Sequence, residues 1–451
     1  MMQFLIAAPR SGSGKTTMTC ALLAALKKRG CDPCAFKSGP DYIDPMFHRS
    51  VLNVGSHNLD LYLSGRDTVQ ALYARYSAGH SAAVCEGAMG FYDGQGMTTR
   101  ASAWELADTL HLPVLLVVQP GGASVTLAAE IQGLVHFRKN SHISGILLNS
   151  CSEKLYKMLK TLLEKETGLP VLGYLPRLPQ AAVESRHLGL KTAGEISDIQ
   201  EKIALLADRL VIDWAKLAAV TERPCPEGNR LSPRGTASAS VRIAVARDSA
   251  FCFAYAETLD ALQEAGAAPV FFSPVHDTAL PEKICGLYLP GGYPELYAQQ
   301  LSENKTMLVS IRQAVNAGLP TVAECGGFLY LGQSLEDAEG KSWPMAGVLP
   351  GSGVKEGRLV RFGYAEMTAK ADSILFRAGE SLPVHEFHHW DSTANGTAFT
   401  ARKSEKMQWE CGFANENFYA GFPHLYWAGT PLPRRFAAAA MQYQQHKGQD
   451  K

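Results

Sequence analysis

The sequence predicts an α/β protein with two domains, each built around a doubly wound and mostly parallel sheet. Two long stretches alternate short apolar runs with helical runs, as strands and helices do in parallel sheets. The apolar runs are continuous, which is typical of strands buried on both faces. A segment rich in Pro, Gly and Ser at residues 222–240 separates the stretches. The chain of 451 residues is also longer than one domain usually holds.

Composition excludes several classes of protein. Hydrophobic residues make up 46% and charged residues 19%, which is typical of globular chains. The 43 basic and 43 acidic residues balance, so we expect no nucleic-acid or membrane-surface partner. No apolar run reaches the ~18 residues of a membrane span. The first residues lack the basic region of a signal peptide, so we expect a cytoplasmic protein whose ten cysteines are mostly free thiols.

The first domain is predicted at residues 1–221. Parallel strands bind ligands at their carboxyl ends. We therefore expect the polar loops that follow these strands to meet in one cleft. The expected strands are residues 4–8, 34–37, 82–86, 113–118, 143–149 and 171–175, and the polar segments at their ends are residues 12–16, 37–44, 86–93 and 149.

The strand at residues 4–8 runs into a loop rich in Gly and Ser and then into a helix from Met18 to Lys28. This is the pattern of a phosphate-binding P-loop, although Pro9 stands where its first glycine is usual. Lys15 would neutralise phosphates, and the Thr16 hydroxyl can bind Mg²⁺. A flexible turn before an ordinary helix is the alternative. The residues expected to bind the nucleotide here are Ser11, Gly12, Ser13, Gly14, Lys15, Thr16 and Thr17.

Polar side chains near the P-loop are candidates for the metal and the substrate. Glu86 ends an apolar strand, so we expect it to bind Mg²⁺ together with Thr16 and Asp41. Turn formation beside Pro40 and Pro45 explains Asp41 and Asp44 equally well. Asn149 is expected to contact the base of the nucleotide, and a polar cap on its strand is the alternative. The residues expected to face the substrate are Lys37, Asp41, Tyr42, Asp44 and Asp93.

The second domain is predicted at residues 241–435, between the linker at 222–240 and a tail at 436–451. Its expected strands are residues 241–246, 268–272, 286–289 and 320–325. The last strand turns sharply into a helical run at Gly326-Gly327, which gives Cys325 the position of the nucleophile in a nucleophile elbow. A helix N-terminus favours the thiolate. A buried structural thiol is the alternative. The nucleophile needs a base, and the candidates are His385, His388, His389 and His424.

The order of motifs resembles the cobyrinate a,c-diamide synthase family over almost the whole chain. The motifs are the P-loop, Gly-Pro-Asp-Tyr-Ile-Asp, Glu-Gly-Ala-Met-Gly-Phe-Tyr-Asp-Gly, Pro-Gly-Gly-Tyr-Pro-Glu, Glu-Cys-Gly-Gly-Phe, His-Glu-Phe-His and Gly-Phe-Pro-His. The first half resembles dethiobiotin-synthetase-like P-loop NTPases, and the second half resembles flavodoxin-like class I glutamine amidotransferases. The resemblance implies a ligase that uses ATP, Mg²⁺ and L-glutamine. It would amidate the a and c carboxylates of cobyrinate, a corrinoid macrocycle, in cobalamin biosynthesis.

The resemblance also assigns roles in the second domain. It implies that Cys325 is the glutaminase nucleophile and His424 its base. It implies an oxyanion hole formed by the backbone N–H groups of Gly292 and Gly326. Class I glutaminases usually place an acid two residues after this histidine, where the chain has Tyr426. What orients His424 is therefore open.

Other functions remain as alternatives. The same motifs fit amidation of hydrogenobyrinate or nickel-sirohydrochlorin. A regulatory P-loop ATPase that acts by binding partners is a rival of another class, and it predicts no need for Cys325.

The chain departs from the family at one further position. The family commonly has Asp where this chain has Gln119, so a role for that carboxylate is not expected here. A homodimer is also left open.

Overall fold

The structure is a computed structural model, and it describes residues 1–181, 185–186, 189–190, 198–226 and 241–449. The chain divides into two compact units, Met1–Leu231 and Ser232–Lys451. Most of the predicted linker, residues 227–240, lies outside the described residues. Within the described part of the chain, no helix is both long and apolar enough to cross a membrane.

The first unit is built around a sheet of eight strands in the order β10-β7-β6-β5-β1-β4-β2-β3. All neighbouring strands are parallel except β10, which pairs antiparallel with β7. The predicted doubly wound sheet is therefore confirmed. The strands are β1 (Met2–Ala7), β2 (Pro33–Ser38), β3 (Ser56–Leu59), β4 (Ala82–Glu86), β5 (Val114–Val118), β6 (Ile143–Asn149), β7 (Val171–Leu175) and β10 (Val211–Ile212); β8 (Ser185–Arg186) and β9 (Gly189–Leu190) form a separate small ribbon.

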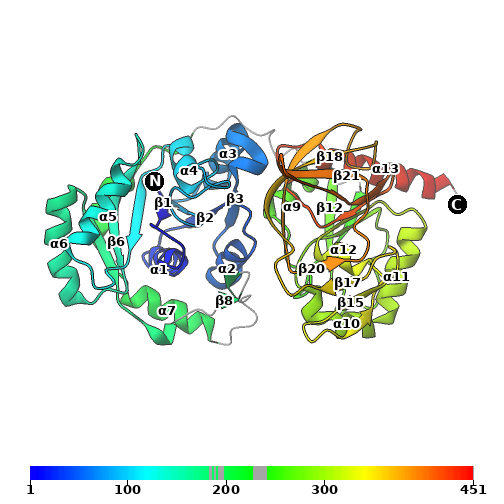
Figure 1. The fold of residues 1–451 in the computed structure, drawn as a ribbon, viewed down its shortest axis with the longest axis horizontal. Coiled ribbons are helices and arrows are strands. Elements are labelled where there is room, and N and C mark those ends of the chain that lie inside the picture. Colours follow the sequence, from blue (N-terminus) through cyan, green and yellow to red (C-terminus); the bar gives the residue numbers. More distant parts are fainter. Residues whose placement is uncertain (182–184, 187–188, 191–197, 227–240, 450–451) are drawn as a thin grey trace. The chain divides into compact units, whose positions relative to one another are not determined.

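Helices cover both faces of this sheet, as Figure 1 shows for α1 and α2 on one side and α3 and α4 on the other. Strand β5 is fully apolar and buried, and β1 is buried from Gln3 to Ala7, because both strands lie at the centre of the sheet. The sequence analysis missed β3 and took the start of α2 for a loop. The helices are α1 (Lys15–Lys28), α2 (Ile43–Leu52), α3 (Leu61–Ser77), α4 (Ala103–Leu110), α5 (Val125–His136), α6 (Glu153–Thr167), α7 (Ile199–Arg209) and α8 (Trp214–Thr221).

The second unit has a central sheet in the order β12-β11-β13-β14-β24-β23, again parallel except at its β23 edge. The predicted parallel sheet is confirmed here too. Its strands are β11 (Val241–Ala246), β12 (Ala267–Phe272), β13 (Gly286–Leu289), β14 (Thr321–Glu324), β23 (Phe413–Asn415) and β24 (Phe418–Gly421), and the helices of the unit are α9 (Ala256–Glu264), α10 (Ala298–Glu303), α11 (Lys305–Asn316), α12 (Gly326–Tyr330) and α13 (Leu432–Gln449).

The two faces of this sheet pack against different layers. Ile243 and Val245 of β11 pack in one apolar cluster, whereas Ala244 and Ala246 pack in another. This alternation is the period of a strand covered on both sides. The first cluster also takes in residues of an antiparallel sheet that the sequence analysis did not predict. That sheet runs β22-β21-β18-β19-β25, and a smaller one runs β16-β15-β17-β20.

The strands of these two added sheets come mainly from the segment between α12 and α13. They are β15 (Ser334–Glu336), β16 (Ser342–Pro344), β17 (Gly353–Lys355), β18 (Arg361–Ala369), β19 (Ser381–His388), β20 (Trp390–Ser392), β21 (Phe399–Ser404), β22 (Met407–Cys411) and β25 (His424–Leu425). Strand β25 follows closely after β24 and pairs with β19, so the chain passes from the central sheet into the antiparallel sheet just beyond the carboxyl end of β24.

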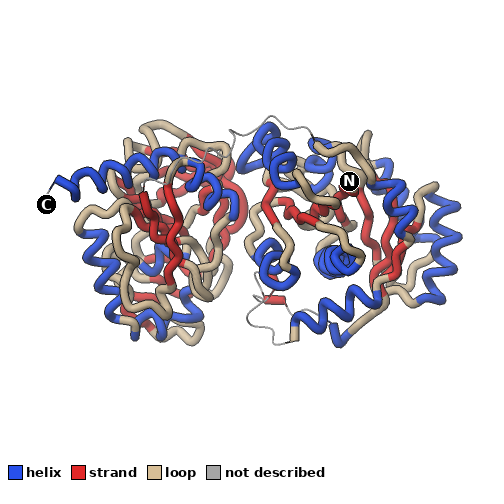
Figure 2. The backbone as a smooth tube through the Cα atoms, turned by 180° about the vertical axis from the view of Figure 1, so that it is seen from behind, coloured by secondary structure: helices blue, strands red, loops and turns tan. Residues whose placement is uncertain are grey.

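The prediction of a tail at residues 436–451 is wrong for the described residues. Residues 436–449 continue helix α13, which passes along one side of the unit in Figure 2. Phe436, Ala437 and Ala440 are buried, and the Phe436 ring packs edge-on against Trp427, with 5.8 Å between the ring centroids. The start of the predicted linker is also anchored, because the N–H of Arg223 donates to Met1 O at 3.0 Å.

We expect Phe436→Ala to lower the free energy of unfolding of the second unit by about 3–5 kcal/mol, because it opens a cavity in a closed apolar cluster. Urea unfolding measures the change. Phe271, which is 45% exposed on β12, is the matched control, and Phe271→Ala should cost less than about 1 kcal/mol. Equal effects of the two substitutions would contradict the packing of α13 described here.

Candidate active sites

The strand order of the first unit makes Glu86 the neighbour of both the P-loop and Lys37. Strand β4 lies between β1 and β2, and in register Glu86 pairs with Ile6 on one side and Lys37 on the other. Ile6 lies one residue before the end of β1, from which the chain enters the P-loop. The carboxyl ends of three adjacent strands therefore bring these residues together, as the sequence analysis expected.

A buried ion cluster surrounds the Lys37 ammonium. Its Nζ lies 2.5 Å from Asp44 Oδ2, 2.7 Å from Glu86 Oε1 and 3.8 Å from Asp41 Oδ2. The Thr16 hydroxyl donates to Glu86 Oε1 at 2.6 Å and lies 3.5 Å from Asp44 Oδ2. Sequence reasoning grouped Asp41 with Thr16 and Glu86, but the structure places Asp44 nearer to Thr16. Asp41 instead accepts from the N–H groups of Ile43 and Asp44 at the start of α2.

Burial and ion pairing act against each other in this cluster. Burial disfavours the ammonium of Lys37, but Asp44 and Glu86 hold its pKa well above the ordinary value. The same ammonium holds the pKa of Asp44 below its usual range, although burial opposes it. Burial raises the pKa of Glu86 to about 7. Lys37 is thus fixed inside the ion cluster, which differs from the expected role of a side chain reaching toward substrate.

The cluster suits a divalent cation that is shared with phosphates. Oε2 of Glu86 is buried and accepts no hydrogen bond from any group that the structure describes. Mg²⁺ prefers oxygen donors and typically takes one or two protein ligands, with water and phosphate completing its shell. Thr16 and Glu86 supply two such oxygens at the foot of the P-loop, with Asp44 next to them. Among the described residues, no group of three or more Asp, Glu, His or Cys side chains is arranged as a metal site of its own.

The P-loop itself is held by Asn149 at the end of β6. Asn149 Nδ2 donates to Ser13 O at 3.1 Å. Gly14 has φ +89°, and a Cβ there would overlap Asn149 Nδ2. Asn149 thus lies against the P-loop, and its expected contact with the base of the nucleotide stays a prediction. A cavity of about 450 Å³ adjoins them and is lined by Gly12, Gly14, Thr17, Gln119, Asn149, Ser150, Leu175, Pro176, Arg177, Leu178, Pro179, Ala181 and Leu206.

The remaining predicted residues of this site surround the loop. Lys15 donates to Met89 O, and burial, reinforced by the Lys37 ammonium, lowers the pKa of Lys15 to about 8. Asp93 Oδ2 accepts from the N–H of Gly90 at 3.1 Å and so braces the loop that carries Met89. Ser13 Oγ donates to Arg10 O. The other predicted residues, Ser11 and Tyr42, lie in the P-loop and just before α2.

The second unit contains the predicted nucleophile elbow. Cys325 joins β14 to α12 with φ +48°, a conformation that costs free energy for any residue with a side chain. Its N–H donates to Gly421 O at 2.8 Å, and its own carbonyl accepts from the N–H of Leu329. These hydrogen bonds to β24 and α12 hold the turn in place. The Cys325 side chain is 8% exposed. This geometry matches a nucleophile presented at the end of a strand.

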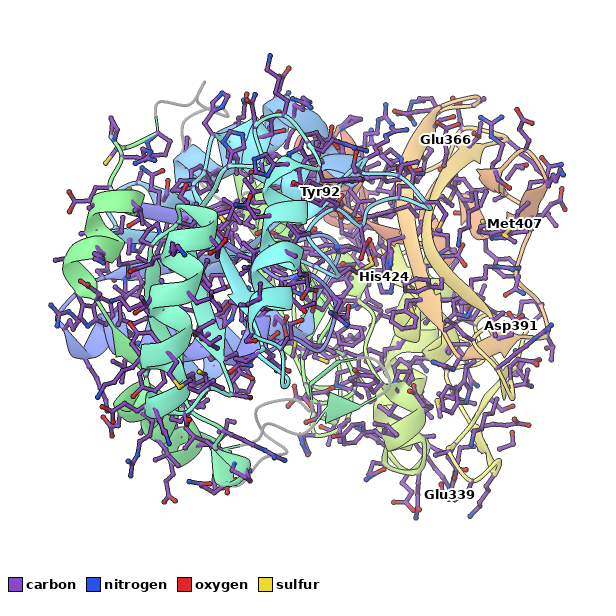
Figure 3. All side chains as sticks on the ribbon, turned by 60° about the vertical axis from the view of Figure 1, so that its left-hand side comes forward. Tyr92, Glu339, Glu366, Asp391, Met407 and His424 are labelled. Atoms are coloured by element: carbon purple, nitrogen blue, oxygen red, sulfur yellow. The ribbon has the colours of Figure 1, made fainter. Side chains whose placement is uncertain are left out.

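His424 is the histidine that the fold brings to Cys325. Both follow adjacent parallel strands, β24 and β14, and their side chains hydrogen-bond. Burial favours the neutral ring, but the Cys325 sulfur and, less strongly, Glu324 raise the pKa of His424 to about 10. In Figure 3 the labelled His424 lies among densely packed side chains, whereas the labelled Met407 lies toward the right-hand side of the view.

The two glycines expected to form the oxyanion hole lie next to each other. A Cβ on Gly326 would lie 3.1 Å from the backbone N of Gly292. The preceding Gly291 packs against His424, since a Cβ there would lie 2.5 Å from Cε1 of this ring. The turn after β13 therefore approaches both Gly326 and His424 closely, which residues without side chains allow.

Two of the other candidate histidines, His388 and His385, have surroundings that differ from those of His424. His388 stacks on Phe422, and its Nε2 lies 3.1 Å from Glu386 Oε2. His385 is the register partner of His424 across β19 and β25, and burial, with the charge on His424, lowers its pKa to about 3. Sequence reasoning missed two buried residues beside the sites, His48 near Glu86 and Glu324 near His424. The sequence could have indicated Glu324, because this residue directly precedes Cys325 in the elbow motif.

Comparisons with known proteins match a different domain family to each unit. Residues 4–190 match the CobQ/CobB/MinD/ParA nucleotide binding domain, and residues 242–431 match the CobB/CobQ-like glutamine amidotransferase domain. Three curated relatives are each named cobyrinate a,c-diamide synthase. The relative from Caldanaerobacter subterraneus subsp. tengcongensis is 38% identical over 428 residues, covering 94% of each chain. The one from Clostridium acetobutylicum is 38% identical and covers 95% of this chain and 98% of its own. The one from Salmonella typhimurium is 37% identical and covers 97% and 98%.

The fold, the two sites and the matched domains define a nucleotide-binding protein fused to a glutamine amidotransferase. The identity to the relatives extends over nearly the full length of both chains. The chain therefore belongs to the cobyrinate a,c-diamide synthase family.

We expect Gly14→Ala to weaken ATP binding about tenfold or more, because the new Cβ displaces Asn149 and the P-loop with it. Isothermal titration calorimetry measures the loss. Gly168, with φ +70° and open space around it at the end of α6, is the matched control. Gly168→Ala should cost stability through its backbone but leave ATP affinity unchanged. Wild-type affinity in Gly14→Ala would contradict the contact.

Proposed function

We propose that this protein is an ATP- and glutamine-dependent ligase that converts the a and c carboxylates of cobyrinate into amides. The observation that carries the proposal is the elbow in which Cys325 hydrogen-bonds with His424, on the same chain as a P-loop with a buried carboxylate cluster. A regulatory P-loop ATPase has no use for this thiol. Membership of the cobyrinate a,c-diamide synthase family supports the choice of substrate.

In the second unit, the Cys325 thiolate attacks the side-chain amide carbon of L-glutamine. Negative charge develops on the amide oxygen, where the N–H groups of Gly292 and Gly326 would stabilise it by about 3 kcal/mol each. The His424 imidazolium gives its proton to the leaving nitrogen, so ammonia departs and a thioester remains. His424 then accepts a proton from water, which hydrolyses the thioester to glutamate and restores the thiolate.

In the first unit, a macrocycle carboxylate attacks the γ-phosphorus of ATP and ADP leaves. The product is an acyl phosphate, which ammonia converts to the amide with release of phosphate. Lys15 would neutralise charge on the transferring phosphoryl group. Thr16 and Glu86 would hold Mg²⁺, with Asp44 beside them, and the ion supplies further neutralisation of phosphate charge. Asp41, Tyr42 and Asp93 remain our candidates for the substrate side of the site.

We expect Cys325→Ala to lower glutamine-supported amidation at least about 10³-fold, because nothing else in the elbow can form the thioester. Amidation supported by added ammonium chloride should remain at the wild-type rate, because the carboxylate is activated in the other unit. Glutamate release and amide formation, measured in parallel, give the two rates.

Cys411 is the matched control, since it is also a buried free thiol of the second unit. Cys411→Ala should retain both activities. If ammonia failed to rescue Cys325→Ala while the variant stayed folded, the division of labour between the two units would be wrong. Normal glutamine-supported activity in Cys325→Ala would contradict the role of Cys325 as nucleophile. A wild-type protein that releases no glutamate from glutamine would favour the regulatory ATPase.

The choice of macrocycle has its own test. Cobyrinate, hydrogenobyrinate and nickel-sirohydrochlorin are offered together with ATP, Mg²⁺ and glutamine, and the products are weighed by mass spectrometry. Each amidation replaces OH by NH₂ and so lowers the mass by about 1 Da, and two replacements on cobyrinate are the expected result. Preferential amidation of another macrocycle would show that the proposed substrate is wrong, whereas the proposed reaction would still hold. A homodimer stays a prediction, which sedimentation equilibrium checks.

A further inference from the structure

The glutaminase site lacks an acid at the place where one was expected. Tyr426 stands two residues after His424, and its buried ring packs edge-on against Tyr255, with 5.0 Å between the ring centroids. A phenol in this position cannot supply the negative charge that an imidazolium gains from a carboxylate. A histidine that takes and returns a proton needs a group that fixes its ring and stabilises its charged form. The structure offers such a group from a different strand.

Glu324 is the last residue of β14, immediately before the nucleophile. Its side chain is 1% exposed. In register it lies opposite Gly421 of β24, which has no side chain to occupy the space. The carboxylate is therefore directed into the region between β14 and the turn that carries His424. Burial of a carboxylate is costly unless charged or hydrogen-bonding groups compensate for it.

Three groups surround the Glu324 carboxylate. Tyr288 Oη donates to Oε2 at 3.4 Å, and Trp427 Nε1 donates to Oε1 at 3.3 Å. The third group is the His424 ring, whose Nδ1 lies 3.8 Å from Oε2. The two donors are neutral, so His424 is the partner that can carry a compensating positive charge. Hydrogen bonds of catalytic histidines are often long without substrate and shorten when it binds.

We propose that Glu324 is the positioning residue for His424, taking over the task of the acid that is missing at position 426. It would fix the imidazole ring through Nδ1 and stabilise its protonated form while Cys325 attacks glutamine. The nucleophile and the group that orients its base are then consecutive residues of one strand end. This inference rests on the proposed glutaminase chemistry.

Apart from the reacting Cys325, the other titratable groups near His424 do not supply the negative charge that would stabilise its protonated ring. On β19, His385 has its pKa lowered to about 3, first by burial and then by His424, so it adds no positive charge near neutral pH. On β13 and β24, burial first and Glu324 second hold the pKa values of Tyr288 and Tyr419 well above the ordinary range, so both phenols stay neutral. Cys325 is the reacting group. Among the described residues, Glu324 is the carboxylate paired with His424.

The test compares Glu324→Gln and Glu324→Asp with the wild-type protein. We expect Glu324→Gln to lower kcat for glutamine hydrolysis about 10²-fold or more, with a much smaller change in KM. Loss of the negative charge lowers the pKa of His424, so the alkaline limb of the kcat profile should move to lower pH. Glu324→Asp should restore part of kcat and the wild-type profile. Ammonia-supported amidation should be unchanged in both variants.

Glu386→Gln is the matched control, because Glu386 is an equally buried carboxylate that pairs with a different histidine, His388. It should leave the pH profile of kcat in place. A wild-type rate and profile in Glu324→Gln would overturn the inference, and the proposed function would stand as long as Cys325→Ala abolished glutamine hydrolysis. If Glu324→Gln lost ammonia-supported amidation as well, and Glu324→Asp did not restore the profile, the role would be structural and the inference wrong.

Discussion

Parallel pairing of neighbouring strands is the constraint on which both candidate sites depend. Each sheet places the carboxyl ends of its central strands side by side, so residues far apart in sequence become neighbours. In the first unit, β4 lies between β1 and β2, and Glu86 thereby meets both the P-loop and Lys37. In the second unit, β14 lies between β13 and β24, so the elbow meets a glycine turn and His424. The helices on both faces keep these strands buried and in register.

Each site also contains charge that burial alone would disfavour, and each compensates for it within the site. Lys37 is stabilised by Asp44 and Glu86, and that ion cluster leaves one oxygen of Glu86 without a hydrogen bond from the described residues. His424 is stabilised by Cys325 and Glu324. The buried charges are therefore held beside the positions where phosphate and thiolate chemistry would occur. Removing one partner of such a pair leaves the other unpaired, which costs more free energy than loss of a surface ion pair.

The sequence was informative wherever a local pattern had one physical cause. The continuous apolar runs gave the central strands to within a few residues, because only buried strands have that pattern at that length. The elbow at Cys325 was readable from its glycines. The strands from β15 to β22 were not predicted, because most of them are short or partly exposed and so carry weak patterns, and their pairing is set by distant segments. Helix α13 was taken for a tail because few of its residues after Phe436 have large apolar side chains.

The sequence by itself determined the fold class, the presence of two domains, the P-loop and the sharp strand-to-helix turn at Cys325, since each depends on contiguous residues whose spacing has a physical cause. Tertiary structure decided which side chains meet. It placed Asp44 beside Thr16, fixed Lys37 among carboxylates, and brought His424 rather than His388 to Cys325. It also directed the carboxylate of Glu324 toward His424, although both residues were visible in the motifs. The physical reason is that strand order and register, which depend on the whole chain, set distances that no local spacing encodes.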